Sequence, residues 1–282
     1  MWTRWPLPIE SALHGETLFR ANGRLVEVHA TVTEGRGRHV DDLSRGEFTL
    51  VVDGKPVPVA SFENQSSAVS VALLFDTTGS MQNALPPLKS AALKLIGEMR
   101  PTDAVAVYSF NVAVTELQPF TTDKAAAERA ILRTHAEGAT ALYDALVRVN
   151  RDLAGRAGKK AIVVFTDGSD NQSVLTAEIA IARARKAAAP IYTIAQGSAL
   201  RDSGLLDQLA RISKSTGGLP FAIHEPAEIL QVFDSVSRDL THGYLLTFQP
   251  PPDDSGGWHR IKVMLSAPRG RTVRAREGYS LE

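Results

Sequence analysis

Residues 69–80 read VSVALLFDTTGS, and this stretch decides the fold class. Its first seven residues form an unbroken, mostly apolar run, which is typical of a strand buried on both faces in a parallel sheet. Two similar runs follow, AIVVFT at 161–166 and IYTIA at 191–195. Amphipathic stretches at helical spacing lie between or after these runs, at 85–99, 142–153 and 229–240. The alternation predicts an α/β domain with a doubly wound, mostly parallel sheet over residues 69–240.

The segments on either side of this region have the two-residue period of antiparallel strands. At 25–33, Val26 and Val28 fall on one face, and Glu27 and His29 fall on the other. Further strand patterns occur at 48–52, 244–248, 261–265 and 272–276. Asp53-Gly54 is a hairpin turn signal.

Each flank supplies only about three strands, too few to bury a core alone. We therefore expect residues 21–68 and 241–282 to form one β-sandwich, with the α/β domain inserted between its halves. The alternative is two separate small appendages packed on the α/β domain. Residues 1–20 show no clear period and are expected to form a tail.

The composition narrows the functional classes. The 282 residues include no cysteine, which excludes disulfide scaffolds, cysteine-ligated zinc and thiol catalysis. Lys+Arg and Asp+Glu both number 31, so no global basic field attracts nucleic acid. No apolar run approaches the roughly 18 residues of a membrane span. Any function must come from a local site.

Side chains that carry oxygen follow two of the buried strands. Asp76, Thr78 and Ser80 leave the end of the first strand at alternate positions, and Asp167 follows the strand at 161–166. Thr140 immediately precedes a helical pattern. Singly, Asp76 and Thr140 read as helix caps. Together, two carboxylates and three hydroxyls at the ligand-binding edge of an α/β sheet suit Mg²⁺, with Mn²⁺ or Ca²⁺ as substitutes.

These residues resemble the metal-ion-dependent adhesion site (MIDAS) of von Willebrand factor type A domains, with Thr78 in place of the usual serine. The wider context is similar to the family too: VALLFDTTGSM, DAVAVYSF, GATALYDAL and AIVVFTDGSDN occur in the expected order. The flanking sequences FTLVVDGKPVPVASF and VRAREGY resemble the bacterial "VWFA-related" group of secreted proteins.

The resemblance implies a Mg²⁺ ion held directly by the serine and threonine hydroxyls, with the aspartates often acting through water. Its open coordination position would take an Asp or Glu carboxylate of a protein partner, so the expected function is adhesion or assembly and not catalysis. The flanks imply a periplasmic or secreted protein. The N-terminus, MWTRWPLPIESALHGE, has no signal-peptide pattern, so a cytoplasmic location is the alternative.

The alternative function is a metal-dependent hydrolase or phosphotransfer enzyme that uses the same cation as a Lewis acid. Such an enzyme needs a general base and phosphate-binding donors, and the motif loops offer no Lys, Arg or His. The stretch 155–160, GRAGKK, lacks the phosphate-loop pattern. Arg271, Arg274 and Arg276 form a basic stripe that we expect on a solvated strand face.

Overall fold

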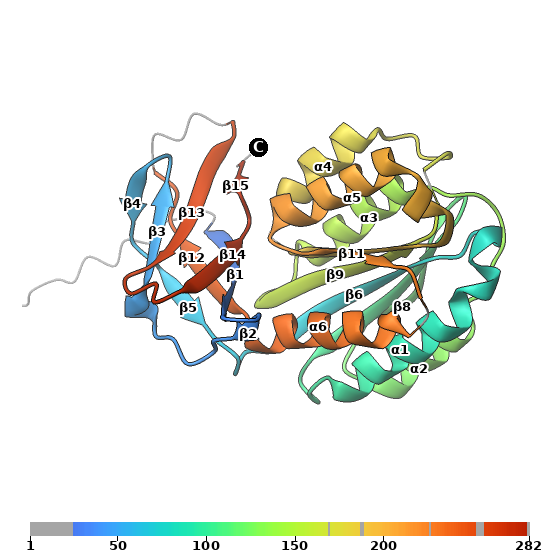
Figure 1. Cartoon of the computed structure of the whole chain (residues 1–282), viewed down its shortest axis with the longest axis horizontal. Coiled ribbons are helices and arrows are strands. Elements are labelled where there is room, and N and C mark those ends of the chain that lie inside the picture. Colours follow the sequence, from blue (N-terminus) through green and yellow to red (C-terminus); the bar gives the residue numbers. More distant parts are fainter. Residues whose placement is uncertain (1–24, 169, 187–188, 226, 252–256, 281–282) are drawn as a thin grey trace, which may run out of the picture.

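The computed structural model describes residues 25–168, 170–186, 189–225, 227–251 and 257–280. The tail expected at 1–20 lies outside these residues. Figure 1 shows two parts side by side, one built of strands alone and one with a sheet between two layers of helices. None of the described helices is long and apolar enough to cross a membrane.

The α/β part is built on a six-stranded mixed sheet with strand order β11-β10-β9-β6-β7-β8. All neighbouring strands are parallel except β7 and β8, which form an antiparallel pair at one edge. The strands are β6 (Val69–Asp76), β7 (Ala104–Phe110), β8 (Val114–Thr121), β9 (Lys159–Thr166), β10 (Ile191–Gln196) and β11 (Pro220–Ile223). This confirms the predicted α/β class, and the antiparallel edge strand β8 is an addition to it.

Helices cover both faces of this sheet (Figure 1). The first face carries α1 (Leu85–Glu98), α2 (Lys124–Leu132) and α6 (Glu228–His242), and the second carries α3 (Leu142–Leu153), α4 (Ala177–Lys186) and α5 (Ser203–Thr216). Short 3-10 turns are η1 (Arg45–Glu47), η2 (Gly79–Asn83) and η3 (Gly197–Arg201). The central strands β6 and β9 are buried along their whole length, as their apolar sequences predict.

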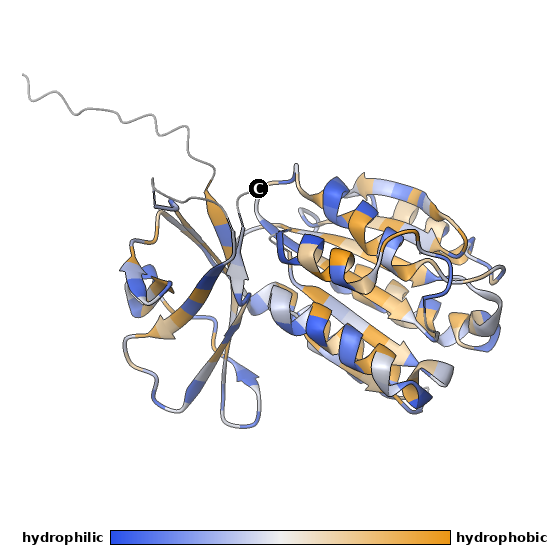
Figure 2. Ribbon diagram, turned by 90° about the horizontal axis from the view of Figure 1, so that it is seen from above, coloured by the Kyte–Doolittle hydropathy of each residue, from blue (hydrophilic) through white to orange (hydrophobic). Residues whose placement is uncertain are grey.

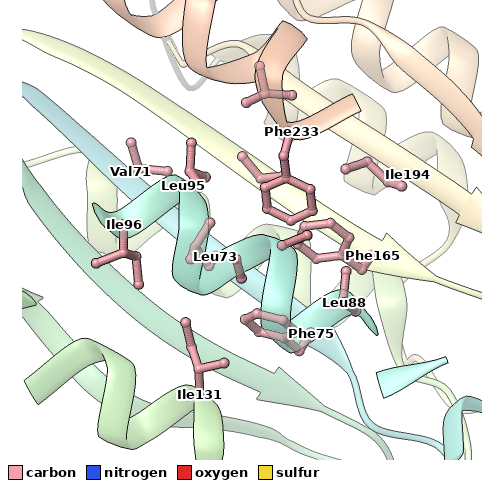
Figure 3. Packing of buried hydrophobic residues seen from close by; sticks show 14 of the residues in the cluster. Val71, Leu73, Phe75, Leu88, Leu95, Ile96, Ile131, Phe165, Ile194 and Phe233 are labelled. Atoms are coloured by element: carbon pink, nitrogen blue, oxygen red, sulfur yellow. The ribbon is translucent and has the colours of Figure 1, made fainter. Parts of the chain in front are cut away.

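An aromatic stack holds the ends of the two central strands together. Phe75 and Phe165 are register partners on β6 and β9, with ring centroids 5.3 Å apart. Phe233 of α6 stacks on Phe165 at 5.1 Å, and Figure 3 shows the three rings in one column. Such pairs stabilise beyond the area that they bury. The stack therefore fixes the backbone immediately before Asp76 and before Asp167.

The two flanks contribute strands to the same two sheets. One sheet has the order β14-β1-β12-β5, with β2 paired to β1, and the other has the order β15-β13-β3-β4. The strands are β1 (Val26–Glu34), β2 (Arg38–His39), β3 (Phe48–Val52), β4 (Lys55–Val57), β5 (Ser61–Glu63), β12 (Tyr244–Phe248), β13 (His259–Leu265), β14 (Arg271–Ala275) and β15 (Gly278–Tyr279).

One apolar cluster includes side chains from both flanks. Val28 of β1, Leu50 of β3, Leu246 of β12 and Ile261 of β13 all belong to it. Figure 2 shows apolar and polar residues alternating along several of these strands. The turn after β3 is the expected hairpin: Asp53 and Gly54 have φ of 48° and 81°, which a two-residue hairpin turn with two left-handed positions requires.

Charged side chains fill the junction between the two parts. Lys160 of β9 lies 2.7 Å from the Glu27 carboxylate of β1. The Lys159 ammonium donates to the carbonyls of Leu240, Thr241 and Gly243, which end or follow α6, at 3.1–3.3 Å. Cations are favourable at a helix C-terminus because the last carbonyls lack partners within the helix. The junction is therefore a polar, hydrogen-bonded contact.

The basic stripe expected on a solvated face is instead part of this junction. Arg276 is 6% exposed and donates to the Glu27 carbonyl at 3.1 Å. Arg274 binds the carboxylate of Asp239 on α6 and the Gly217 carbonyl. The prediction was wrong for these two residues because α6 and the α5–β11 loop cover the strand face that carries Arg274.

Candidate functional site

The candidate site lies at the carboxyl edge of the two central strands, β6 and β9. Phe75 and Phe165 are paired in register, so Asp76 and Thr166 follow them side by side. Asp167 is the next residue. In an open α/β sheet this edge is where helices and loops leave room for a ligand. The predicted residues of the first strand end and those of the second therefore meet in space.

Asp76 is fully buried, and both of its carboxylate oxygens have partners. One oxygen accepts from the backbone N–H of Thr78 at 3.0 Å, and the other accepts from the Thr166 hydroxyl at 2.7 Å. Burial raises the pKa of Asp76 to about 6, against the lowering effect of these hydrogen bonds, and the charge of Asp167 raises it further. The site thus holds a carboxylate whose charge the protein alone does not compensate.

Thr78, Ser80 and Asp167 form a continuous hydrogen-bonded chain. The hydroxyls of Thr78 and Ser80 lie 3.1 Å apart, and the Ser80 hydroxyl donates to the Asp167 carboxylate at 2.8 Å. Asp167 is 4% exposed, and burial raises its pKa. Ser80 is exposed, so the chain runs from a buried carboxylate to the surface. Three oxygen side chains from two loops therefore converge.

The loop after β10 supports Asp167 from the other side. The Asp167 carbonyl accepts from the Ala199 N–H at 2.8 Å and from the Ser198 hydroxyl. Gly197 has a φ of 59°, and a Cβ placed there would lie 3.4 Å from the Asp167 Cβ. A side chain at this position would be both strained and crowded against the site. Gly197 therefore allows the loop after β10 to approach Asp167 closely.

Thr140 lies beside these residues. Among the described residues, its side chain makes no hydrogen bond to Thr78, Ser80 or Asp167. A Cβ at Gly168 would lie 3.8 Å from the Thr140 hydroxyl oxygen, which places that hydroxyl next to the residue after Asp167. The Thr140 N–H donates to the Asn171 side chain at 3.1 Å, and its carbonyl accepts from the N–H groups of Asn171 and Gln172. All five predicted residues thus lie on three adjoining loops.

Sequence reasoning missed the residues that hold these five in place. Thr166, Asn171 and Gly197 each bond or abut a predicted residue, yet none carries a motif of its own. Thr166 ends a buried strand and reads there as an ordinary β-branched residue. Its place as the polar residue that ends the apolar run at 161–165 is the one signal that marks it.

The donor set of the site is compatible with a hard divalent cation. Among the described residues, no group of three or more His, Cys, Asp or Glu side chains is placed to hold a metal ion. A cation at this edge would therefore depend on the hydroxyl oxygens as well as on the two carboxylates. Oxygen donors alone suit Mg²⁺ or Ca²⁺ and disfavour softer metals. The two buried carboxylates supply a reason for a positive ion to bind.

No Lys, Arg or His donates a hydrogen bond to the five predicted residues in the described parts of the chain. Protein cations therefore leave the negative charge of Asp76 and Asp167 unpaired. A charged group taken out of water without a partner is unfavourable. A bound cation is one arrangement that relieves this situation, and protonation is the other.

Residues 71–169 match the family model of the von Willebrand factor type A domain. A search among curated proteins finds no significant match to the sequence. Among solved structures, the chain is similar to a von Willebrand factor type A protein from Catenulispora acidiphila, with a TM-score of 0.56 and 15% identity. That match covers 90% of this chain and 73% of the other.

Two shorter structures each match 61% of this chain. BatB from Bacteroides thetaiotaomicron gives a TM-score of 0.51 at 18% identity, with 61% of this chain and 98% of that chain covered. The vWF domain of the type V pili tip protein Mfa5 from Porphyromonas gingivalis gives 0.51 at 16% identity, covering 61% and 94%. At such identities the likeness shows the fold alone. Residues 71–169 are thus similar in sequence to the von Willebrand factor type A domain, and the chain shares the fold of these solved structures.

Proposed function

We propose that this chain is a Mg²⁺-dependent protein-binding module, which binds an acidic side chain of a partner through a MIDAS-type metal. Asp76, Thr78, Ser80, Thr140 and Asp167 would hold the cation, with Mn²⁺ or Ca²⁺ as possible substitutes. The observation that carries the proposal is the chain of hydrogen bonds from Thr78 through Ser80 to Asp167, 3.1 and 2.8 Å long, beside the buried Asp76.

The charge of the site supports an anionic ligand. Two ionised carboxylates can at most neutralise the charge of a divalent cation. Burial raises the pKa values of Asp76 and Asp167 and so favours their neutral forms. Hydroxyl oxygens add coordination without adding charge. When bound, the metal would supply a concentrated positive charge at the exposed end of the site, beside Ser80. A carboxylate is the protein group that such a charge binds best.

The surroundings of the site support binding and not turnover. No Lys, Arg or His hydrogen-bonds to the five residues in the described structure, so a general base and phosphate-binding donors have no candidates among these contacts. We therefore propose adhesion or assembly as the role. The pilus-tip protein among the structural neighbours shares this fold, and its setting agrees with a periplasmic or secreted location.

We also propose that residues 21–68 and 241–282 act as one β-sandwich domain, with 69–240 as the inserted von Willebrand factor type A domain. The shared apolar cluster and the mixed origin of both sheets support this division. Hydrogen exchange on the intact chain tests it. Amides of β1 and β12 should open in one cooperative step, and separate opening of the two flanks would contradict a shared domain.

The functional proposal is tested by capturing partners from native extract on the immobilised protein. Wild type should retain a protein in Mg²⁺ and release it in EDTA. The Thr78→Val variant keeps the side-chain shape but loses the hydroxyl, so it should retain much less. The Thr78→Ser variant is the matched control and should behave as wild type. A partner that is held equally in EDTA, or equally by Thr78→Val, would contradict metal-dependent binding.

A further inference from the structure

A groove on the outer surface between α3 and α4 shares no residue with the candidate metal site. Its volume is about 370 Å³, within the size range of small-ligand sites. Val147 of α3, Ala154 at the end of that helix and Leu175 of the loop before α4 supply an apolar wall. A groove of this size on a packed helix pair has room for the body of a small organic molecule.

The groove is lined by an excess of positive charge, although the whole chain is neutral. Arg148, Arg151, Arg183 and Lys186 line it. Among the lining residues, Asp144 is the only acidic one. Its two carboxylate oxygens each accept a backbone N–H, from Val174 and Leu175, at 3.0 Å. The lining therefore favours an anion.

The lining arginines differ in how far other groups occupy them. Arg148 donates to Asp152 at 2.7 Å and lies 3.7 Å from Glu116. Arg151 lies 3.6 Å from the same Asp152 carboxylate, and its side chain is 71% exposed. Arg183 is exposed and makes no ion pair within the described residues. Arg151 and Arg183 are thus the guanidinium groups most available to a ligand.

Asn150 supplies a second and independent sign of a ligand. It lines the same groove and is 4% exposed, and neither its amide nitrogen nor its amide oxygen has a hydrogen-bond partner in the described structure. A buried polar group without a partner is unfavourable by about 1–3 kcal/mol, and most such groups in proteins are satisfied. An amide needs both a donor and an acceptor, which a ligand with a polar edge provides.

We infer that the α3–α4 groove binds a small organic anion, with its oxyanion at Arg151 and Arg183 and its neutral polar edge at Asn150. Guanidinium groups match phosphate and carboxylate oxygens with paired hydrogen bonds. The apolar wall formed by Val147 and Leu175 takes the body of the molecule. Because the amide atoms of Asn150 are covered, binding requires a shift of the side chains that cover them.

Adenosine monophosphate and citrate are suitable probes. Both carry oxyanions, phosphate in one case and carboxylates in the other, and the adenine edge matches an asparagine amide. Isothermal titration at low salt, with protein stripped of metal and then dialysed into chelator-free buffer to exclude binding through the metal site, should give a Kd below about 1 mM for at least one probe. Neutral adenosine should bind much more weakly, because it lacks the oxyanion.

Three variants locate the binding. Arg183→Gln should weaken the probe about tenfold, as expected for one charge-assisted contact. Arg238→Gln, on the exposed face of α6, is the matched control and should leave the Kd unchanged. Asn150→Leu removes the unsatisfied amide, so it should fold with stability at least equal to wild type and yet bind the probe more weakly.

The same titrations can overturn the inference. Failure of both probes to bind in this range, or equal weakening by Arg183→Gln and Arg238→Gln, would mean that the groove has no anion site. Unchanged binding by Asn150→Leu would show that the Asn150 amide does not contact the ligand, which contradicts the assignment. Each result is independent of the proposed metal site, because the protein is metal-free throughout.

Discussion

Replacing Asp76 with asparagine should stabilise the metal-free protein at neutral pH and at the same time abolish the stabilisation by Mg²⁺. Burial raises the pKa of the Asp76 carboxyl from 3.8 to about 6. A carboxyl group with a raised folded-state pKa stabilises the fold when protonated. This stabilisation is lost as the pH rises from the unfolded-state pKa through the folded-state pKa. Above about pH 6 the ionised Asp76 therefore destabilises the empty protein.

The structure sets the size of the effect. At about 1.4 kcal/mol per pH unit, a rise from 3.8 to about 6 corresponds to a destabilisation of about 3 kcal/mol at pH 7.5. The asparagine amide can keep the local hydrogen bonds. Its oxygen still accepts from the Thr78 N–H, its nitrogen donates to Thr166, and the Thr166 hydroxyl then donates to the Gly168 carbonyl 3.1 Å away. Most of the gain should therefore be realised.

Urea unfolding in EDTA measures the gain at two pH values. Asp76→Asn should exceed wild type by about 2–3 kcal/mol at pH 7.5 and by about 1 kcal/mol at pH 4.5, where wild-type Asp76 is protonated in the folded state. Asp207→Asn, at an exposed position of α5, is the control and should change neither value. No gain at pH 7.5, or a gain independent of pH, would refute the argument that burial of an uncompensated carboxylate strains this site.

Three further predictions follow from other parts of the structure. His29→Leu should remove a destabilisation of about 2 kcal/mol at pH 5. Burial and Lys160 lower the pKa of His29 from 6.5 to about 3, so at pH 5 the unfolded chain binds more protons than the folded protein. Urea unfolding at pH 5 and pH 7 measures the effect, and equal pH dependence in variant and wild type would contradict it. Gly218→Ala should lower the unfolding free energy by roughly 3 kcal/mol or more, since a Cβ there would lie 2.0 Å from the Ile191 carbonyl oxygen. Gly97→Ala, in open space on α1, should instead raise the unfolding free energy by about 0.5–1 kcal/mol. Thermal unfolding of both variants tests the contrast. Thr78→Ser should keep the Mg²⁺ affinity of wild type and Thr78→Val should weaken it, which calorimetric titration with Mg²⁺ measures, and equal affinities in the two variants would show that the hydroxyl is not a ligand.

The sheet of the α/β part could be predicted because burial on both faces leaves a direct signature. The runs within β6, β9 and β10 are nearly continuous in apolar residues, and few other structures explain such runs. The edge strand β8 has no such signature. Its residues are all partly or fully exposed, and it includes Pro119, which reads as a loop in a sequence but is tolerated at a sheet edge.

The candidate site was visible in the sequence because its residues lie at strand ends. Asp76 and Asp167 each follow an apolar run directly, and the parallel arrangement of β6 and β9 brings the two ends together. The supporting loop after β10 was not visible. Gly197 is needed there because of its left-handed φ of 59° and its approach to Asp167, and one glycine in one sequence does not announce such a contact.

There is a physical reason why the sequence does not predict the junction between the two parts. Charged side chains in a sequence are normally taken as solvent-exposed, and most are. Lys159, Lys160 and Arg276 are buried here because carbonyl groups and the Glu27 carboxylate satisfy them across the junction. The partners are far apart in the chain, so periodicity within one strand carries no trace of them.

The binding of Mg²⁺ at the strand ends is the central claim, and thermal unfolding with and without Mg²⁺ tests it most directly. Wild type should be stabilised by RT ln(1 + [Mg²⁺]/Kd), about 2.7 kcal/mol at a concentration 100 times the Kd. Asp167→Ala should lose this stabilisation. Without metal, its melting temperature should not fall below that of wild type on account of charge, because the substitution also removes a buried carboxylate. Equal stabilisation of wild type and Asp167→Ala by Mg²⁺ would place the cation elsewhere and contradict the proposed site.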